Sequence, residues 1–187
     1  TTSDHGIQMN SGSAVSSTGT AEVMLNGMSS NGEGIQLHGA GTLVTSLNGA
    51  LSVMGTGGNY GVYLYGNADI TSTGSAIITV NGTVDDMANG EDGVFIGDAG
   101  TTITSLAGDI LITGNTIGSG TSDHGIQMNS GSDVSSTGAA QVMLNGTSSN
   151  GEGIQMHGAG TLVASLNGNL SLTGIGGNYG VVVYGDA

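Results

Sequence analysis

Apolar and polar residues alternate in short segments along this chain, which is the two-residue period of a β-strand. The segments return at a nearly regular interval, and each interval opens with a glycine followed by Ile or Val. The opening glycines are Gly6, Gly34, Gly61, Gly93, Gly125, Gly153 and Gly180. From each opening glycine to the glycine that closes the last apolar run, every complete unit spans 22 residues. The length varies only in the segment that follows, as expected for a coil of fixed circumference with one variable loop.

Three alternating segments fit into each unit. We expect equivalent apolar positions of successive units to point into a common interior. These positions are Ile7, Ile35, Val62, Val94, Ile126, Ile154 and Val181 in the first segment, Val15, Val44, Ile70, Ile103, Val134 and Val163 in the middle one, and Val23, Leu51, Ile78, Ile110, Val142 and Leu170 in the last. The middle segment shifts by one residue between odd and even units.

Three short strands per unit, without helical periodicity, predict an all-β parallel β-helix (β-solenoid) of about six coils of 27–32 residues. Meanders and sandwiches do not require a constant circuit. We place the repeated glycines at the corners and treat residues 1–187 as one continuous solenoid segment. The predicted coils are 6–33, 34–60, 61–92, 93–124, 125–152 and 153–179, with a partial coil at 180–187.

A longer repeat contains four of these coils. Residues 2–68 return as 121–187, at an offset of 119, and 54 of the 68 positions aligned between 1–68 and 120–187 are identical. A single catalytic pocket does not require its scaffold to be copied. A stacked architecture does, because each unit buries its apolar face only against its neighbours.

The charge is entirely acidic. The chain has no Lys or Arg and 14 Asp plus Glu, giving a formal net charge of −14. Nucleic acids and anionic membranes are bound largely through Lys and Arg, so we expect neither as a partner. No apolar run approaches the roughly 20 residues of a membrane span, so we expect no membrane insertion. A hydrophobic content of 36%, placed periodically, argues against disorder.

All aromatic residues lie in the first strand of a coil or directly before it. We interpret them as a candidate stripe for lateral or ligand contact, with the β-propensity of an exposed strand as the alternative. The six residues are Tyr60, Tyr63, Tyr65, Phe95, Tyr179 and Tyr184.

Four acidic residues lie close together in one variable segment: Asp85, Asp86, Glu91 and Asp92. Oxygen ligands of this kind suit Ca²⁺, which makes them a candidate calcium site. A diffuse counter-ion cloud is the alternative, because the spacing matches neither an EF-hand nor the glycine-rich calcium repeat of β-helices. We predict no other cofactor.

Repeated serines and histidines do not indicate catalysis. A nucleophile needs one adjacent base, whereas a serine recurs at the same corner of successive coils, where hydroxyls are expected to hydrogen-bond along the stack. His38 and His157 are equivalent positions four coils apart and face outward, and His5 and His124 are likewise equivalent. We therefore predict that the protein is not an enzyme.

The coil pattern, G-[IV]-x-Φ-x followed by S-x-x-G and Φ-x-Φ-x-G, resembles the β-helical shafts of large secreted bacterial repeat proteins. Filamentous haemagglutinin-like adhesins, autotransporter passengers and giant extracellular matrix proteins are the nearest comparison. The resemblance covers the whole chain and implies a stiff rod located outside the cell or on its surface. Coils of 27 to 32 residues are longer than those common in adhesin shafts, and the loss of every Lys and Arg is a further departure.

From these observations we expect a structural protein, a segment of a long β-solenoid filament, sheath or adhesin shaft. The expected partners are further copies of the chain, end to end and side by side. The alternatives are a carbohydrate-binding adhesin rod that contacts cell-surface glycans and, more distantly, an ice-binding or polysaccharide-active β-helix.

Overall fold

The computed structural model describes residues 4–85, 91–118, 121–185 and 187. Its strands form three parallel sheets, here called A, B and C. Sheet A contains β1 (Ile7–Met9), β4 (Glu33–His38), β7 (Tyr60–Tyr65), β10 (Asp92–Gly97), β13 (His124–Asn129), β16 (Glu152–His157) and β19 (Tyr179–Tyr184). Sheet B contains β2 (Ala14–Ser17), β5 (Leu43–Ser46), β8 (Asp69–Ser72), β11 (Thr102–Ser105), β14 (Asp133–Ser136) and β17 (Leu162–Ser165). Sheet C contains β3 (Val23–Met28), β6 (Leu51–Gly57), β9 (Ile78–Val84), β12 (Ile110–Thr116), β15 (Val142–Ser148) and β18 (Leu170–Gly176).

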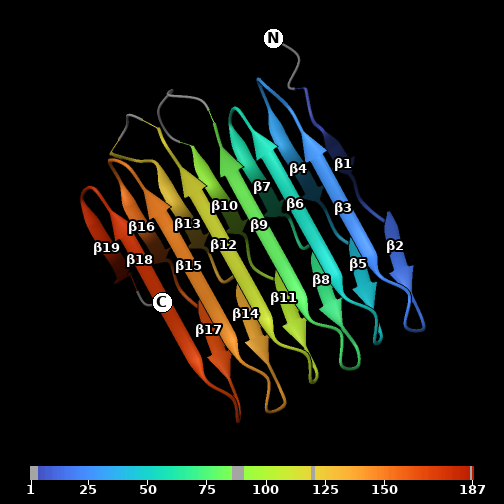
Figure 1. Cartoon of the computed structure of the whole chain (residues 1–187). Helices are drawn as coiled ribbons and strands as arrows, with labels where there is room; N and C mark the ends of the chain where they lie inside the picture. Colours follow the sequence, from blue (N-terminus) through green and yellow to red (C-terminus); the bar gives the residue numbers. More distant parts are fainter. Residues whose placement is uncertain (1–3, 86–90, 119–120, 186) are drawn as a thin grey trace.

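The chain passes through sheets A, B and C in turn and then repeats the circuit. Each strand pairs in parallel with the strand three elements away in the sequence, so β1 lies beside β4 and β4 beside β7. In Figure 1 the strands of sheet C lie in front, those of sheet A lie behind them, and the chain advances steadily from β1 to β19. The predicted parallel β-solenoid, with three sheets and about six coils, is confirmed.

The core consists of equivalent aliphatic residues stacked one above another. Register pairs Ile7 with Ile35 and Ile35 with Val62, as the alternation predicted. Ile35 and Val62 are completely buried, because each has a coil on both sides. At roughly 2 kcal/mol for each fully buried aliphatic side chain, these columns are a main source of stability.

The placement of the repeated glycines at corners is wrong, because they lie inside strands of sheets A and C. A Cβ on Gly114 in β12 would overlap the carbonyl oxygen of Gly125 in β13, and a Cβ on Gly125 would overlap the amide nitrogen of Thr147 in β15. The two backbones therefore touch directly across the interior. The residues of the two glycine columns are Gly6, Gly34, Gly61, Gly93, Gly125, Gly153 and Gly180 in or directly before sheet A strands, and Gly27, Gly55, Gly82, Gly114, Gly146 and Gly174 in sheet C.

The one-residue shift of the middle segment is absorbed by its two corners. The strands of sheet B pair in one continuous register, with Val15 opposite Val44 and Val44 opposite Ile70. In alternate coils the corner before sheet B is one residue longer and the corner after it one residue shorter. The longer corner after His38 contains Gly39, whose φ of 89° is favoured by glycine. Circuit length is thereby conserved.

The corner serines bond mainly within their own coil, which corrects the expectation of bonding along the stack. The hydroxyls of Ser46 and Ser105 donate to the carbonyl oxygens of Gly49 and Gly108, at 2.6 Å in both cases. Ser165 differs, because its hydroxyl donates to the carbonyl oxygen of Ala140 in the preceding coil, at 2.9 Å. These serines therefore close the turn between sheets B and C.

Contact between the glycine columns predicts a severe effect of adding one methyl group. Gly114→Ala should lower the free energy of unfolding by about 3 kcal/mol or more, the upper end of overpacking costs, because the clash is with backbone. Gly19→Ala is the matched control, since a Cβ there meets no atom within 4 Å, and should change stability by less than about 0.5 kcal/mol. Chemical denaturation of both variants makes the comparison. Equal stabilities would contradict direct backbone packing.

Candidate functional site

One column of sheet A consists largely of ionisable side chains. It is formed by the residue that precedes each opening glycine, one residue from each coil. Register pairs Glu33 with Tyr60, Tyr60 with Asp92, and Asp92 with His124. We call this column the ionisable ladder, and its members are His5, Glu33, Tyr60, Asp92, His124, Glu152 and Tyr179.

His124 lies at the centre of the ladder between two carboxylates. Its Nδ1 is 2.6 Å from Oδ1 of Asp92, and its Nε2 is 3.1 Å from Oε2 of Glu152. The backbone amide of His124 also donates to the same Asp92 oxygen, at 3.1 Å. All three residues are buried. The equivalent pair in the other copy of the repeat joins His5 Nδ1 to Glu33 Oε2.

These contacts determine the protonation of the pair. Burial by itself lowers the pKa of His124, but the hydrogen bond and charge of Asp92, with the charges of Glu152 and Asp123, outweigh it and raise that pKa. Burial raises the pKa of Asp92, and its hydrogen bonds with His124 act in the opposite direction. Burial prevails at Asp92, so the pKa of its carboxyl is also raised overall. The contacts of His124 favour its protonated form, in a chain without Lys or Arg.

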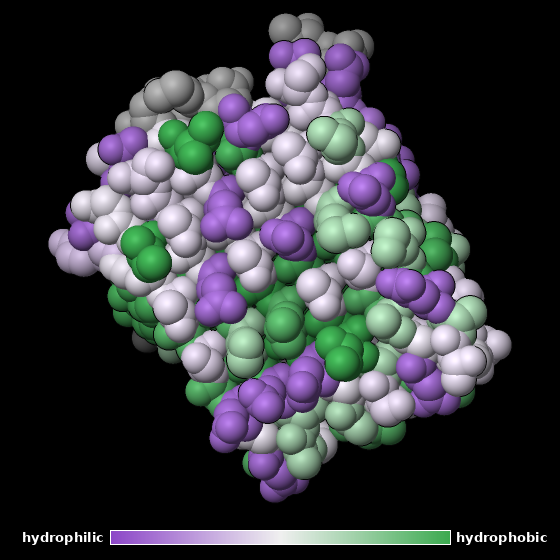
Figure 2. All heavy atoms as spheres, in the orientation of Figure 1, coloured by the Kyte–Doolittle hydropathy of each residue, from purple (hydrophilic) through white to green (hydrophobic). Residues whose placement is uncertain are grey.

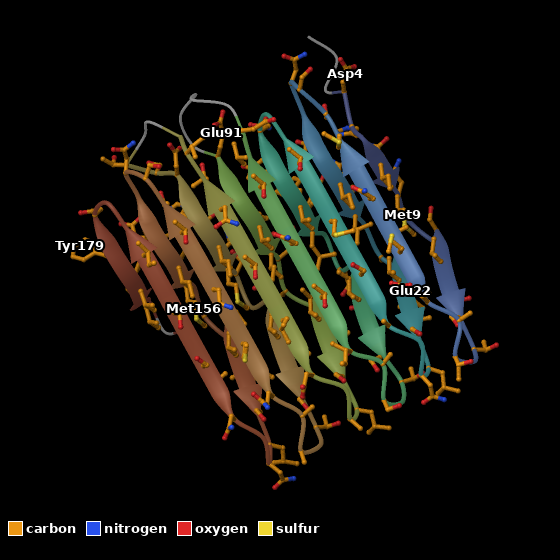
Figure 3. All side chains as sticks on the ribbon, in the orientation of Figure 1. Asp4, Met9, Glu22, Glu91, Met156 and Tyr179 are labelled. Atoms are coloured by element: carbon orange, nitrogen blue, oxygen red, sulfur yellow. The ribbon has the colours of Figure 1, made fainter. Side chains whose placement is uncertain are left out.

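Three of the four predicted calcium ligands, Asp85, Glu91 and Asp92, lie among the described residues. Asp92 bonds His124, and the backbone amide of Glu91 donates to Oδ1 of Asp123, at 3.1 Å. Glu91 lies near the edge where sheet C leads into sheet A (Figure 3), and Asp85 directly follows β9. Among the described residues no group of three or more His, Asp or Glu is arranged to hold a metal ion. Asp86 lies outside the described residues, so calcium binding stays a prediction.

Four of the six aromatic residues form one cluster. The ring of Tyr63 lies 4.3 Å from those of Tyr60 and Tyr65 and 4.8 Å from that of Phe95, measured between centroids. His38 stacks on Tyr65 at 4.2 Å. Burial among these rings raises the pKa of Tyr63 to about 12, with nearby acidic groups adding to the effect. The rings thus contact one another extensively, which leaves fewer ring faces for a partner.

The remaining two aromatic residues lie apart from this cluster, so the stripe is divided in space. Tyr184 stacks on His157 with centroids 5.4 Å apart. Tyr179 is exposed on the last strand and points away from the molecule in Figure 3.

A polar groove runs over sheet A beside the ladder. Gln127 and Gln155, which lie one coil apart on the outer face, are joined by a hydrogen bond of 2.9 Å. The groove is lined by Tyr60, Asp92, Thr121, Ser122, His124, Gln127, Glu152, Gln155, His157 and Tyr184. It offers amide, imidazole, hydroxyl and carboxylate groups for hydrogen bonding, and no fixed cation for an anionic ligand.

Sequence reasoning identified His5 and His124 as equivalent positions but missed their carboxylate partners. The pairing of each histidine with an acid could have been predicted from the residues that precede the opening glycines. Read down the column, they give the order His, Glu, Tyr, Asp, then His, Glu, Tyr. That order places each histidine beside an acid once the coils are stacked in register.

Comparison with known proteins found no matching family model, curated protein or solved structure. The fold itself defines the class, a β-solenoid of about six turns. Over the described ranges, no helix has the length and apolar character needed to cross a membrane.

The ladder predicts that stability falls at alkaline pH. The pKa of His124 is higher in the folded chain than its ordinary value near 6.5, so its stabilising contribution is complete below about pH 6.5 and is lost as pH rises through the folded pKa. Each unit of that pKa difference corresponds to about 1.4 kcal/mol. Urea denaturation from about pH 6 to about pH 9 measures the fall, because deprotonation leaves Asp92 and Glu152 buried without their cation.

His124→Gln should remove much of this alkaline fall, although it also lowers stability at neutral pH. His157→Gln is the matched substitution outside the ladder and should retain the fall. Identical pH profiles for the wild-type chain and His124→Gln would contradict a stabilising, protonated His124.

Proposed function

We propose that this chain is a structural rod, a segment of a β-solenoid filament, sheath or adhesin shaft. The observation that carries the proposal is the in-register stacking of a four-coil repeat. Residues separated by 119 positions occupy equivalent places four coils apart, as Ile7 and Ile126 do in sheet A. A rod built from such units grows by the addition of further coils, because each new coil buries the apolar face of the previous one.

The chemistry of the side chains supports a structural role. The acids nearest His124 form its ion pairs, and the aromatic cluster packs largely on itself. Both arrangements link successive coils. A groove built for catalysis places reactive groups at hydrogen-bond distance from a substrate, whereas Asp92 and Glu152 are already engaged with His124.

The composition suits exposure outside the cell or on its surface. A chain without Lys or Arg offers no site to trypsin-type proteases and no side-chain amine for crosslinking. Its uniform negative charge keeps rods in solution apart until salt or protons screen it. Further copies of the chain, stacked end to end, are the partners that this role requires.

A glycan-binding rod is the second candidate, and the groove over sheet A favours it. Gln127, Gln155 and His157 present hydrogen-bonding groups there, beside the rings of Tyr60 and Tyr184. Polar groups next to aromatic surface are typical features of ligand sites. Binding of the chain to a panel of immobilised neutral glycans, abolished by Gln155→Ala, would favour this candidate.

The structural role is tested by building longer arrays. Chains with one, two and four tandem copies of residues 2–120 should appear in electron micrographs as rods of constant width. Each added copy should lengthen the rod by about 19 Å, four coils at the strand spacing of about 4.8 Å. Thermal stability should also rise with copy number, because stacked repeats stabilise one another. Separate particles joined like beads would contradict the proposal.

A further inference from the structure

Sheet C differs from the other two sheets in having no charged residue. Its six strands contain no Asp, Glu or His, in a chain with 14 acids and four histidines. Sheet A includes Glu33, Asp92 and Glu152, and sheet B includes Asp69 and Asp133. The nearest acids of known position lie at the rim, where Glu22 and Asp109 directly precede β3 and β12 and Asp85 directly follows β9.

The outward positions of sheet C form three regular columns. They consist of Thr, Ser, Asn and Met with a few larger aliphatic residues, all partly or fully exposed. The columns are Met24, Ser52, Thr79, Leu111, Met143 and Ser171; Asn26, Met54, Asn81, Thr113, Asn145 and Thr173; and Met28, Thr56, Thr83, Asn115, Thr147 and Ile175. Figure 2 views the molecule from this side and shows mainly pale and green surface, with separate hydrophilic patches.

Charge makes this face unique among the three. Two copies of a chain with net charge −14 repel each other. Contact through sheet B brings the partly exposed Asp69 and Asp133 near the acids of the other copy. Contact through sheet A covers the groove lined by Asp92 and Glu152, which are buried and paired with His124. Contact through sheet C keeps those charges away from the centre of the interface. The centres of protein interfaces are depleted in charged residues and enriched in Met, and both features are present here.

The available area is sufficient for a specific contact. Six strands about 4.8 Å apart, each presenting roughly 20 Å of its length, give about 600 Å² on each rod. Two rods would bury about 1,200 Å² in total, at the lower end of specific interfaces. Every further four coils would add about 400 Å² per rod, so the contact strengthens with length.

We propose that the outer face of sheet C is a lateral interface between two copies of this chain. The proposal rests on the fold rather than on the structural role, and it extends that role from single rods to paired ones. It also moves the expected side-by-side contact away from the aromatic residues, because Tyr63 and Phe95 already pack on each other.

Analytical ultracentrifugation of the whole chain, at low salt and at about 0.15 M salt, tests the proposal. A concentration-dependent dimer should form and should be stronger at the higher salt. Adding like charges to the middle column, with Met54→Glu and Thr113→Glu together, should weaken dimerisation by about 100-fold or more, because like charges would meet in the interface. A wild-type chain that stays monomeric at both salts would overturn the interface.

The matched control adds two charges to the outer face of sheet B in the same two coils. The double variant Thr45→Glu, Thr104→Glu should dimerise almost as strongly as the wild-type chain. Thr45 in β5 and Thr104 in β11 belong to sheet B, outside the proposed interface. Equal weakening by the two double variants would overturn the proposal, since it would reflect net charge alone. Greater weakening by Tyr63→Ser, Tyr65→Ser and Phe95→Ser combined would assign the contact to the aromatic cluster instead.

A second measurement uses variants without added charge, so a folding defect caused by a buried charge cannot affect it. The chain has no cysteine, so Thr113→Cys and Thr104→Cys each introduce a single reactive thiol. Alkylation of Cys at position 113 should slow as protein concentration rises, whereas alkylation at position 104 should stay constant. Equal rates at every concentration would overturn the interface, and rod length in micrographs would still report on the structural role independently.

Discussion

Direct contact between the backbones of sheets A and C is the constraint on which this solenoid depends. Facing sheets normally lie about 10 Å apart, separated by side chains. Here the glycine columns remove the side chains along one line, so the backbones of residues such as Gly114 and Gly125 meet. Each coil must bring one glycine of each column to the next strand position along the rod. The chain segment from the sheet A glycine to the sheet C glycine of the same coil therefore always spans 22 residues. Variation in length is confined to the segment outside this contact.

The fixed circuit also explains how chemistry is distributed over the molecule. Because every coil repeats the same path, one residue type can be aligned over another along the whole rod. Aliphatic columns fill the interior, and the ladder places His124 between Asp92 and Glu152 on successive coils. The three outer faces thereby acquire different characters. Sheet A carries ionisable, aromatic and amide groups, while sheet C carries none that is charged.

Much of the fold was predictable because equivalent positions share a period. Alternation gave the direction of Ile7, Ile35 and Val62, and the interval gave their stacking. The glycines were misplaced because alternation reports which way a side chain points, not how closely two backbones approach. The corner serines were misjudged for a related reason: a periodic hydroxyl can bond within its coil or between coils, and only local geometry distinguishes the two.

The candidate site was predictable only in part. The aromatic positions and the acidic segment were visible in the sequence, but their partners were not. Asp92 is 32 positions from His124, and the two become neighbours only because one coil lies on the next. This pairing gives Asp92, one of the predicted calcium ligands, a hydrogen bond to a buried histidine. Single residues and short motifs do not contain that information.

The backbones of the two glycine columns meet with no side chain of their own between them. A nuclear Overhauser measurement on a chain labelled at glycine Cα detects this contact. Cross-peaks are expected between the Hα protons of Gly114 and those of Gly93 and Gly125, which belong to the facing sheet. If these glycines occupied corners, or if side chains separated the sheets by the usual distance of about 10 Å, the cross-peaks would be missing and direct backbone contact would be ruled out.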